Sequence, residues 1–95
     1  MAVTAFNKHK VNDYASWKRV YDEKASLRKE HGATSASVYR DPEDPNMITV
    51  TVHFDSLSDA RAFVNSDDLK AAMQQAGVSG PPEIWIYEDV ESTPY

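Results

Sequence analysis

The segment that most constrains the fold is the run from Met47 to Phe54, in which apolar and more polar side chains alternate. Its sequence is Met47-Ile48-Thr49-Val50-Thr51-Val52-His53-Phe54. A period of two residues predicts a β-strand with one buried face and one polar face. The buried face requires a covering layer. The other face, which ends at His53, is free to meet water, a ligand or a second subunit.

The rest of the chain predicts three more strands and three helices. Asn12 or Asp13 is expected to cap a helix that ends at His31-Gly32. Asp55 or Ser56 is expected to cap a second helix, which Asn65-Ser66 separates from a short third helix ending at Gly77. The predicted strands are 2–11, 33–40, 47–54 and 83–89, with a proline-stiffened loop at 41–46, an extended crossing at 80–82 and a polar tail at 91–95.

This order, β-α-β-β-α-α-β, predicts an α+β fold of the ferredoxin-like type, with an antiparallel-dominated sheet covered by helices on one face. We expect the first and third strands to lie side by side and parallel at the centre. His9 and His53 would then sit at the same end of neighbouring strands. The face that His9 occupies stays open, because Phe6 favours even positions of the first strand facing the helices while Lys8 and Lys10 favour the opposite.

Composition narrows the classes of partner. Residues 1–95 suffice for one domain, with an ordered core expected at about 2–90. A net charge of −5 and the absence of a Lys/Arg stripe argue against nucleic-acid binding. The chain has no cysteine, which excludes disulfides and thiolate chemistry. No long apolar run or secretion signal is recognised, so the sequence predicts a soluble cytoplasmic protein without a membrane partner.

The uncovered face of the sheet predicts self-association. Large aromatic side chains there would be left in water, and burying each is worth about 2–3 kcal/mol. We therefore expect a homodimer in which two sheets stack. The residues expected at the interface are Thr49, Thr51, Trp85 and Tyr87.

Three local patterns carry a resemblance to a known family. They are His9-Lys10-Val11 followed by Asp13-Tyr14 and Trp17, then Leu27-Arg28 with Gly32, and Gly80-Pro81-Pro82-Glu83. With the order of elements, they resemble the antibiotic biosynthesis monooxygenase (ABM)-like family over nearly the whole chain. The resemblance implies a dimeric α+β barrel with a small pocket between helices and sheet in each subunit. It also implies chemistry on compact aromatic or quinol-like molecules, often oxygenation without metal or flavin.

Two branches of that family fit less well. Haem-degrading relatives use a histidine on the later helices, and residues 57–76 contain none. The Asn–Trp–Tyr set of the polyketide-oxidising members has no counterpart after the third strand, where Phe54-Asp55-Ser56-Leu57 stands. The resemblance therefore leaves both substrate and reaction open, and isomerases, decarboxylases and proteins without known activity are also among the relatives.

The residues themselves offer a short list of candidates for chemistry. Imidazole is the side chain that titrates near neutrality, so His9 and His53 are the candidate bases, each weighed against a structural role. Two histidines without a nearby third ligand fall short of a metal site, and no nucleotide motif is present, so we expect neither metal nor cofactor. The candidate substrate-binding residues are Asn7, Trp17, Tyr21, Phe63 and Met73.

Trp17 and Tyr21 lie four residues apart on one helix face, where they could fill the core or form the wall of a pocket. Two hypotheses follow. The first is a cofactor-independent monooxygenase, cyclase or isomerase, and the second is a non-catalytic small-molecule-binding or interaction protein on the same fold. Polar groups of Asn7, His9 or Tyr21 converging on a cavity favour the enzyme, and a filled interior favours the alternative.

Overall fold

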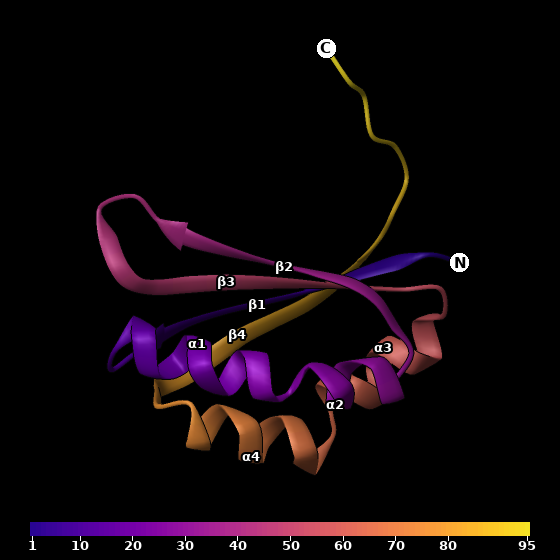
Figure 1. Ribbon diagram of the computed structural model, residues 1–95. Coiled ribbons are helices and arrows are strands. Elements are labelled where there is room, and N and C mark those ends of the chain that lie inside the picture. The colour runs from indigo at the N-terminus through magenta and orange to yellow at the C-terminus, as the bar shows by residue number, and fades with distance from the viewer.

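The computed structural model describes residues 1–95 and consists of a four-stranded sheet with all four helices on one face (Figure 1). This is the ferredoxin-like α+β fold that the sequence predicts. The elements in chain order are β1 (Val3–Val11), α1 (Tyr14–Glu23), α2 (Ala25–Glu30), β2 (Ala33–Asp41), β3 (Asp44–Phe54), α3 (Leu57–Val64), α4 (Asp67–Gln75) and β4 (Val78–Glu88).

The strands are arranged β2-β3-β1-β4, and every neighbouring pair is antiparallel. The expectation that the first and third strands run parallel is wrong. The helical crossover returns the chain parallel to β1 in β2, and the tight turn then reverses it into β3 beside β1. In the resulting register His9 pairs with Ile48 and Thr4 pairs with His53, so the two histidines lie at opposite ends of the β1–β3 ladder.

The apolar residues of β3 face the core beneath the helices, as the alternation in the sequence predicts. Ile48, Val52 and Phe54 are all buried beneath the helices, with Phe54 only 1% exposed. In β1 the odd positions face the same core, since Val3 and Val11 are buried there. Phe6 therefore points to the uncovered face, and the charges of Lys8 and Lys10 identified the outward positions correctly.

The hairpin between β2 and β3 is tighter than the sequence predicts. The ladder continues to the pair Asp41–Asp44, so the six-residue proline loop is reduced to Pro42-Glu43. Pro45 lies within β3 without breaking the sheet. Proline has no backbone N–H to donate to a neighbouring strand. The β1–β3 pairing stops at Met47, so no residue of β1 lies opposite Pro45 to require that donor.

The first helix is divided. Asp13 caps α1, its carboxylate accepting a hydrogen bond from the Ser16 backbone N–H at 2.9 Å. Lys24 then ends α1 and precedes α2 with φ −95° and ψ 13°. The predicted continuous helix is therefore wrong at this residue. Ser56, one of the two residues expected to cap the second helix, caps α3. Ser66, expected only to separate the two helices, caps α4.

The last strand begins at Val78, five residues earlier than predicted. The predicted crossing, Gly80-Pro81-Pro82, belongs to β4 and coincides with a shift in its register against β1, between the pairs Lys8–Glu83 and Lys10–Ser79. β4 is an edge strand, so its prolines need not donate to a second neighbour. After Glu88 the chain leaves the sheet on the side away from the helices (Figure 1). None of the helices is both long and apolar enough to span a bilayer.

Gly32 links α2 to β2 with a positive φ of 96°, and a Cβ there would stand 2.8 Å from an Asp59 carboxylate oxygen. We expect Gly32→Ala to lower the free energy of unfolding by about 1–2 kcal/mol, because L-residues are strained in this backbone region. Gly80→Ala has a similar positive φ of 74° but no atom within 4 Å, so it measures the backbone strain without the contact to Asp59. Urea denaturation should show a loss of stability in both variants, and a neutral Gly32→Ala would contradict the assigned strain.

Candidate functional site

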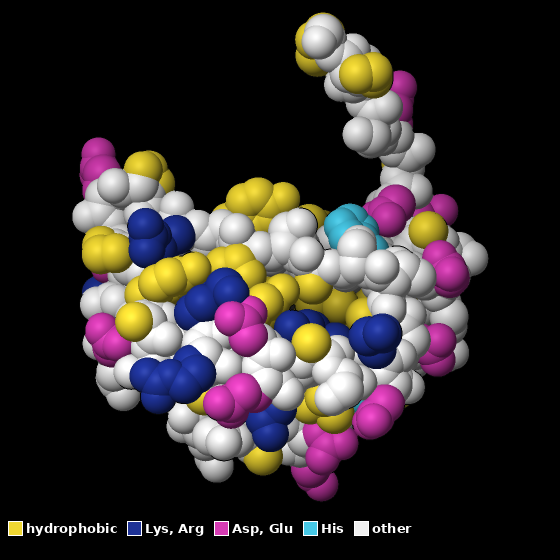
Figure 2. Space-filling view, viewed as in Figure 1, with side chains coloured by type: hydrophobic (Ala, Val, Ile, Leu, Met, Phe, Trp, Pro, Cys, Tyr) yellow, Lys and Arg dark blue, Asp and Glu magenta, His cyan; other side chains and the backbone are white.

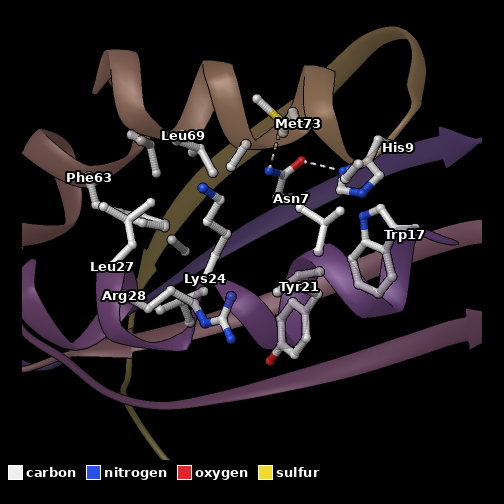
Figure 3. Close-up of a pocket in the computed structure, with 17 residues that line it drawn as sticks. Asn7, His9, Trp17, Tyr21, Lys24, Leu27, Arg28, Phe63, Leu69 and Met73 are labelled. Carbon is white, nitrogen blue, oxygen red and sulfur yellow. Dashed lines mark hydrogen bonds between the residues drawn. The ribbon is translucent and has the colours of Figure 1, made fainter.

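A pocket of about 70 Å³ lies between the helices and the sheet (Figure 3). Thirteen of its 17 lining residues are hydrophobic, so a ligand inside would be largely removed from water. Its floor is formed by Ala5, Val50 and Val52 of the sheet. The four remaining residues are Asn7, His9, Lys24 and Arg28, and no Asp or Glu lines the pocket. The interior is therefore hollow rather than filled.

Asn7 and His9 form the polar end of the pocket. They lie two residues apart on β1 and so share the face that points to the helices. The Asn7 amide oxygen lies 2.9 Å from His9 Nδ1, and its amide nitrogen donates to the Met73 sulfur at 3.5 Å. Because the Asn7 nitrogen faces Met73, its oxygen accepts from His9, which places the imidazole proton on Nδ1. Figure 3 shows this chain of contacts reaching from α4 to β1.

The other ring nitrogen of His9 is left without a partner. His9 is 5% exposed, and its Nε2 is buried with no hydrogen bond. With the proton on Nδ1, Nε2 carries a free lone pair. Burial lowers the pKa of His9 from 6.5 to about 4, because the charged imidazolium loses its hydration. His9 is therefore neutral at pH 7 and able to accept a proton.

This shift predicts a pH dependence of stability. Because the folded pKa lies below the unfolded value, the unfolded chain binds a proton first as the pH falls. The contribution of neutral His9 is present above pH 6.5 and is lost between 6.5 and about 4. We expect the stability advantage of the wild type over His9→Gln to shrink across this window in urea titrations. A constant difference would contradict the lowered pKa.

Trp17 and Tyr21 form the aromatic wall of the pocket. Their rings stack with centroids 5.2 Å apart, and Trp17 also lies 5.8 Å from the His9 ring. The Arg28 guanidinium lies over the other part of this wall, 3.8 Å from the Tyr21 ring centre. The hydroxyl of Tyr21 points away from Asn7 and His9 (Figure 3). Tyr21 thus contributes its ring, and not a hydroxyl beside the imidazole.

The other two predicted substrate-binding residues also line the pocket. Phe63 enters from α3 and Met73 from α4. Lys24, Arg28 and Leu69 also line the pocket and are not among the predicted site residues. The helical spacing of Trp17, Tyr21, Lys24 and Arg28 is the signal in the sequence that places the two cations on this wall.

The comparisons with known proteins agree with this geometry. A family model described as antibiotic biosynthesis monooxygenase matches residues 3–75. The chain belongs to this family. No curated protein matches the sequence.

Solved structures of the antibiotic biosynthesis monooxygenase fold superpose over nearly the whole chain. SnoaB, a cofactor-independent oxygenase from Streptomyces nogalater, has a TM-score of 0.80 at 14% identity, with 99% of this chain and 98% of that chain covered. A candidate antibiotic biosynthesis monooxygenase from Bordetella bronchiseptica has a TM-score of 0.80 at 16% identity, with 95% and 98% covered. At these identities the likeness shows the shared fold.

His53 lies on the face of the sheet opposite the pocket. Thr4 Oγ1 is 2.8 Å from His53 Nδ1 and donates to the Asp89 carboxylate, so Thr4 links the two side chains. The expectation that His9 and His53 meet at one end of the sheet is therefore wrong, because β1 and β3 are antiparallel. Of the two, only His9 lines the pocket.

The uncovered sheet face carries the four residues predicted for an interface. The register places Thr49, Thr51 and Trp85 on it together with Phe6, and Tyr87 follows Trp85 by two residues. Phe6 stacks on Trp85 at 5.5 Å, while Tyr87 is 62% exposed. No group of three or more His, Cys, Asp or Glu side chains is placed to hold a metal ion.

Proposed function

We propose that this protein is a small-molecule enzyme that oxygenates or rearranges a compact phenol- or quinol-like metabolite without a tightly held cofactor. One observation carries the proposal: His9 lines an apolar pocket with its Nδ1 held by Asn7, and its buried Nε2 has no hydrogen-bond partner. A buried acceptor without a donor is costly to the folded state, and a substrate hydroxyl would supply the missing donor. Family membership supports the same class of chemistry.

The proposed role of His9 is to accept the substrate proton at Nε2. Asn7 fixes the tautomer and orientation through Nδ1, as an orienting group does for a general base. A lowered pKa makes His9 a weak base toward water. Toward a bound phenol the balance improves, because proton transfer creates an imidazolium and a phenolate that attract each other strongly in an apolar cavity.

Oxygenation then proceeds with the substrate as its own reductant. The phenolate transfers an electron to dioxygen, and recombination forms a carbon–oxygen bond to a peroxide. The imidazolium returns its proton to that peroxide, and loss of water leaves a second carbonyl. A phenol and one O₂ thus give a quinone and one H₂O. The role of Trp17, Tyr21, Phe63 and Met73 in this proposal is to position the ring and exclude bulk water.

A homodimer is part of the proposal. The aromatic side chains of Phe6, Trp85 and Tyr87 on the uncovered face support it, since such a surface gains by burial against a second copy. The family fold supports the same arrangement.

The test is oxygen consumption by the purified protein with a panel of phenols and quinols, followed by mass spectrometry of the products. We expect uptake of one O₂ per substrate and a product heavier by one oxygen atom and lighter by two hydrogen atoms. Saturable binding of these compounds without any turnover would refute the enzymatic proposal and support the non-catalytic binding protein instead.

A further inference from the structure

The pocket has a charge balance opposite to that of the chain. The whole sequence contains 15 acidic and 10 basic residues, yet the pocket wall includes two cations and no carboxylate. The cations are Lys24, at the break between α1 and α2, and Arg28 in α2. His9 adds no charge at neutral pH, because its pKa is lowered to about 4. The pocket is therefore cationic at its helical side.

Neither cation has an acidic partner. The side chains of Lys24 and Arg28 make no salt bridge and no hydrogen bond, whereas the nearby Asp22 is bound by Lys18 at 2.6 Å. Glu23, Glu30 and Asp68 line a separate outer groove that also reaches Lys24, but none of them pairs with it. Both cations are therefore available to bind an anionic group of a ligand. Figure 2 shows Lys and Arg side chains beside apolar surface between the helices and the sheet.

Arg28 is held in a geometry suited to an anion. Its guanidinium stacks on Tyr21 at 3.8 Å, and stacking occupies the flat face of the group while leaving its N–H edges for an acceptor. Burial lowers the pKa of Arg28, since part of its hydration is lost. Guanidinium still stays charged at any ordinary pH, so a bound carboxylate would replace the lost hydration with charge-assisted hydrogen bonds.

The cations lie on the side of the pocket away from His9. Figure 3 shows Asn7 and His9 together on one side, Lys24 and Arg28 on the other, and the ring of Tyr21 between Arg28 and Trp17. Trp17, beside His9, and Lys24 are seven residues apart, roughly 10 Å along the helical layer at 1.5 Å per residue. This separation suits a molecule with one aromatic ring or a fused ring pair.

We propose that the substrate carries a carboxylate, held by Lys24 and Arg28, at the end opposite the hydroxyl that faces His9. The ligand class is thus a hydroxylated aromatic acid. This inference rests on the proposed function for the hydroxyl that faces His9. The carboxylate site itself depends only on the two cations and the apolar pocket.

The test compares para-hydroxybenzoate with para-hydroxybenzamide, which have the same shape but differ in charge. Binding is measured by NMR titration at pH 7.5 and low ionic strength. We expect the carboxylate to bind about tenfold more tightly, and the preference to fall with added salt. Lys24→Gln and Arg28→Gln should each reduce the preference by about three- to tenfold. Lys29→Gln, an exposed neutralisation on the same helix, is the matched control and should keep it.

The outcomes separate this inference from the proposed function. Equal affinities for the two probes, binding of neither, or an unchanged preference in both Lys24→Gln and Arg28→Gln overturns the carboxylate site. Oxygen uptake with neutral quinols would leave the enzymatic proposal standing in that case. A carboxylate preference without turnover on any phenol would instead retain the site and remove the catalytic proposal. Chemical shifts of the backbone report whether each variant is folded.

Discussion

Replacing His9 by glutamine is expected to lower turnover by about 10²–10⁴-fold, the usual contribution of a positioned general base. Glutamine is polar and similar in length, so it can still contact Asn7, but it cannot accept the substrate proton. Because the loss arises in the chemical step, kcat should fall with a smaller change in KM. Oxygen uptake and product formation on the best substrate of the phenol panel measure both quantities.

Two other histidines provide controls. His31→Gln alters a histidine near Phe63 and Asp68 that does not line the pocket, and His53→Gln alters the one on the opposite face of the sheet. Both variants should keep turnover close to wild type. Full activity in His9→Gln would show that the imidazole is not the base. Deprotonation of an acidic substrate in solution, followed by its own reaction with oxygen, would then be the better explanation.

The sequence predicted the elements with clear periodicity better than the connections between them. Alternation from Ile48 to Phe54 identified the buried face, and the capping pairs Asn12-Asp13 and Asp55-Ser56 located the helix starts, where Asp13 and Ser56 are the caps. The break at Lys24 was missed because neither proline nor glycine marks it. The early start of β4 was missed because two prolines are normally read as ending a ladder, and only its position at the sheet edge permits them.

The predicted site residues lie together in the pocket, but its two cations and its arrangement were not predicted. All five predicted substrate-binding residues line the pocket, together with His9. The pairing of His9 with His53 failed because it assumed that the first and third strands are parallel, whereas a helical crossover followed by a hairpin turn makes β3 antiparallel to β1. The Asn7–His9 contact is a different case. Residues two apart in a strand share a face, which places Asn7 and His9 on the same side of β1. The sequence left open which side that is, because Phe6 and the two lysines Lys8 and Lys10 indicated opposite faces.

The second large effect is expected at the uncovered face of the sheet, where Trp85→Ala should weaken dimerisation by about 2 kcal/mol or more, a 30-fold or greater rise in the dissociation constant. In the single chain, Trp85 stacks on Phe6 with the ring planes 2° apart, and Tyr87 contacts Phe6 edge-on. These three rings together present an apolar surface. The free energy gained by burying it against a second copy must exceed the entropic cost of association. Removing the Trp85 ring from the cluster lowers that gain.

Sedimentation velocity over a range of protein concentrations measures this dissociation constant. The wild type should sediment at about twice the chain mass of 10.7 kDa at micromolar concentration, with Trp85→Ala dissociating there. Tyr21→Ala removes an aromatic ring from the opposite side of the sheet and should leave association unchanged, so a loss common to both variants would indicate impaired folding. A wild-type protein that is monomeric at these concentrations would exclude the dimer. Dimerisation that survives Trp85→Ala undiminished would place the contact between subunits somewhere other than the Phe6–Trp85–Tyr87 surface.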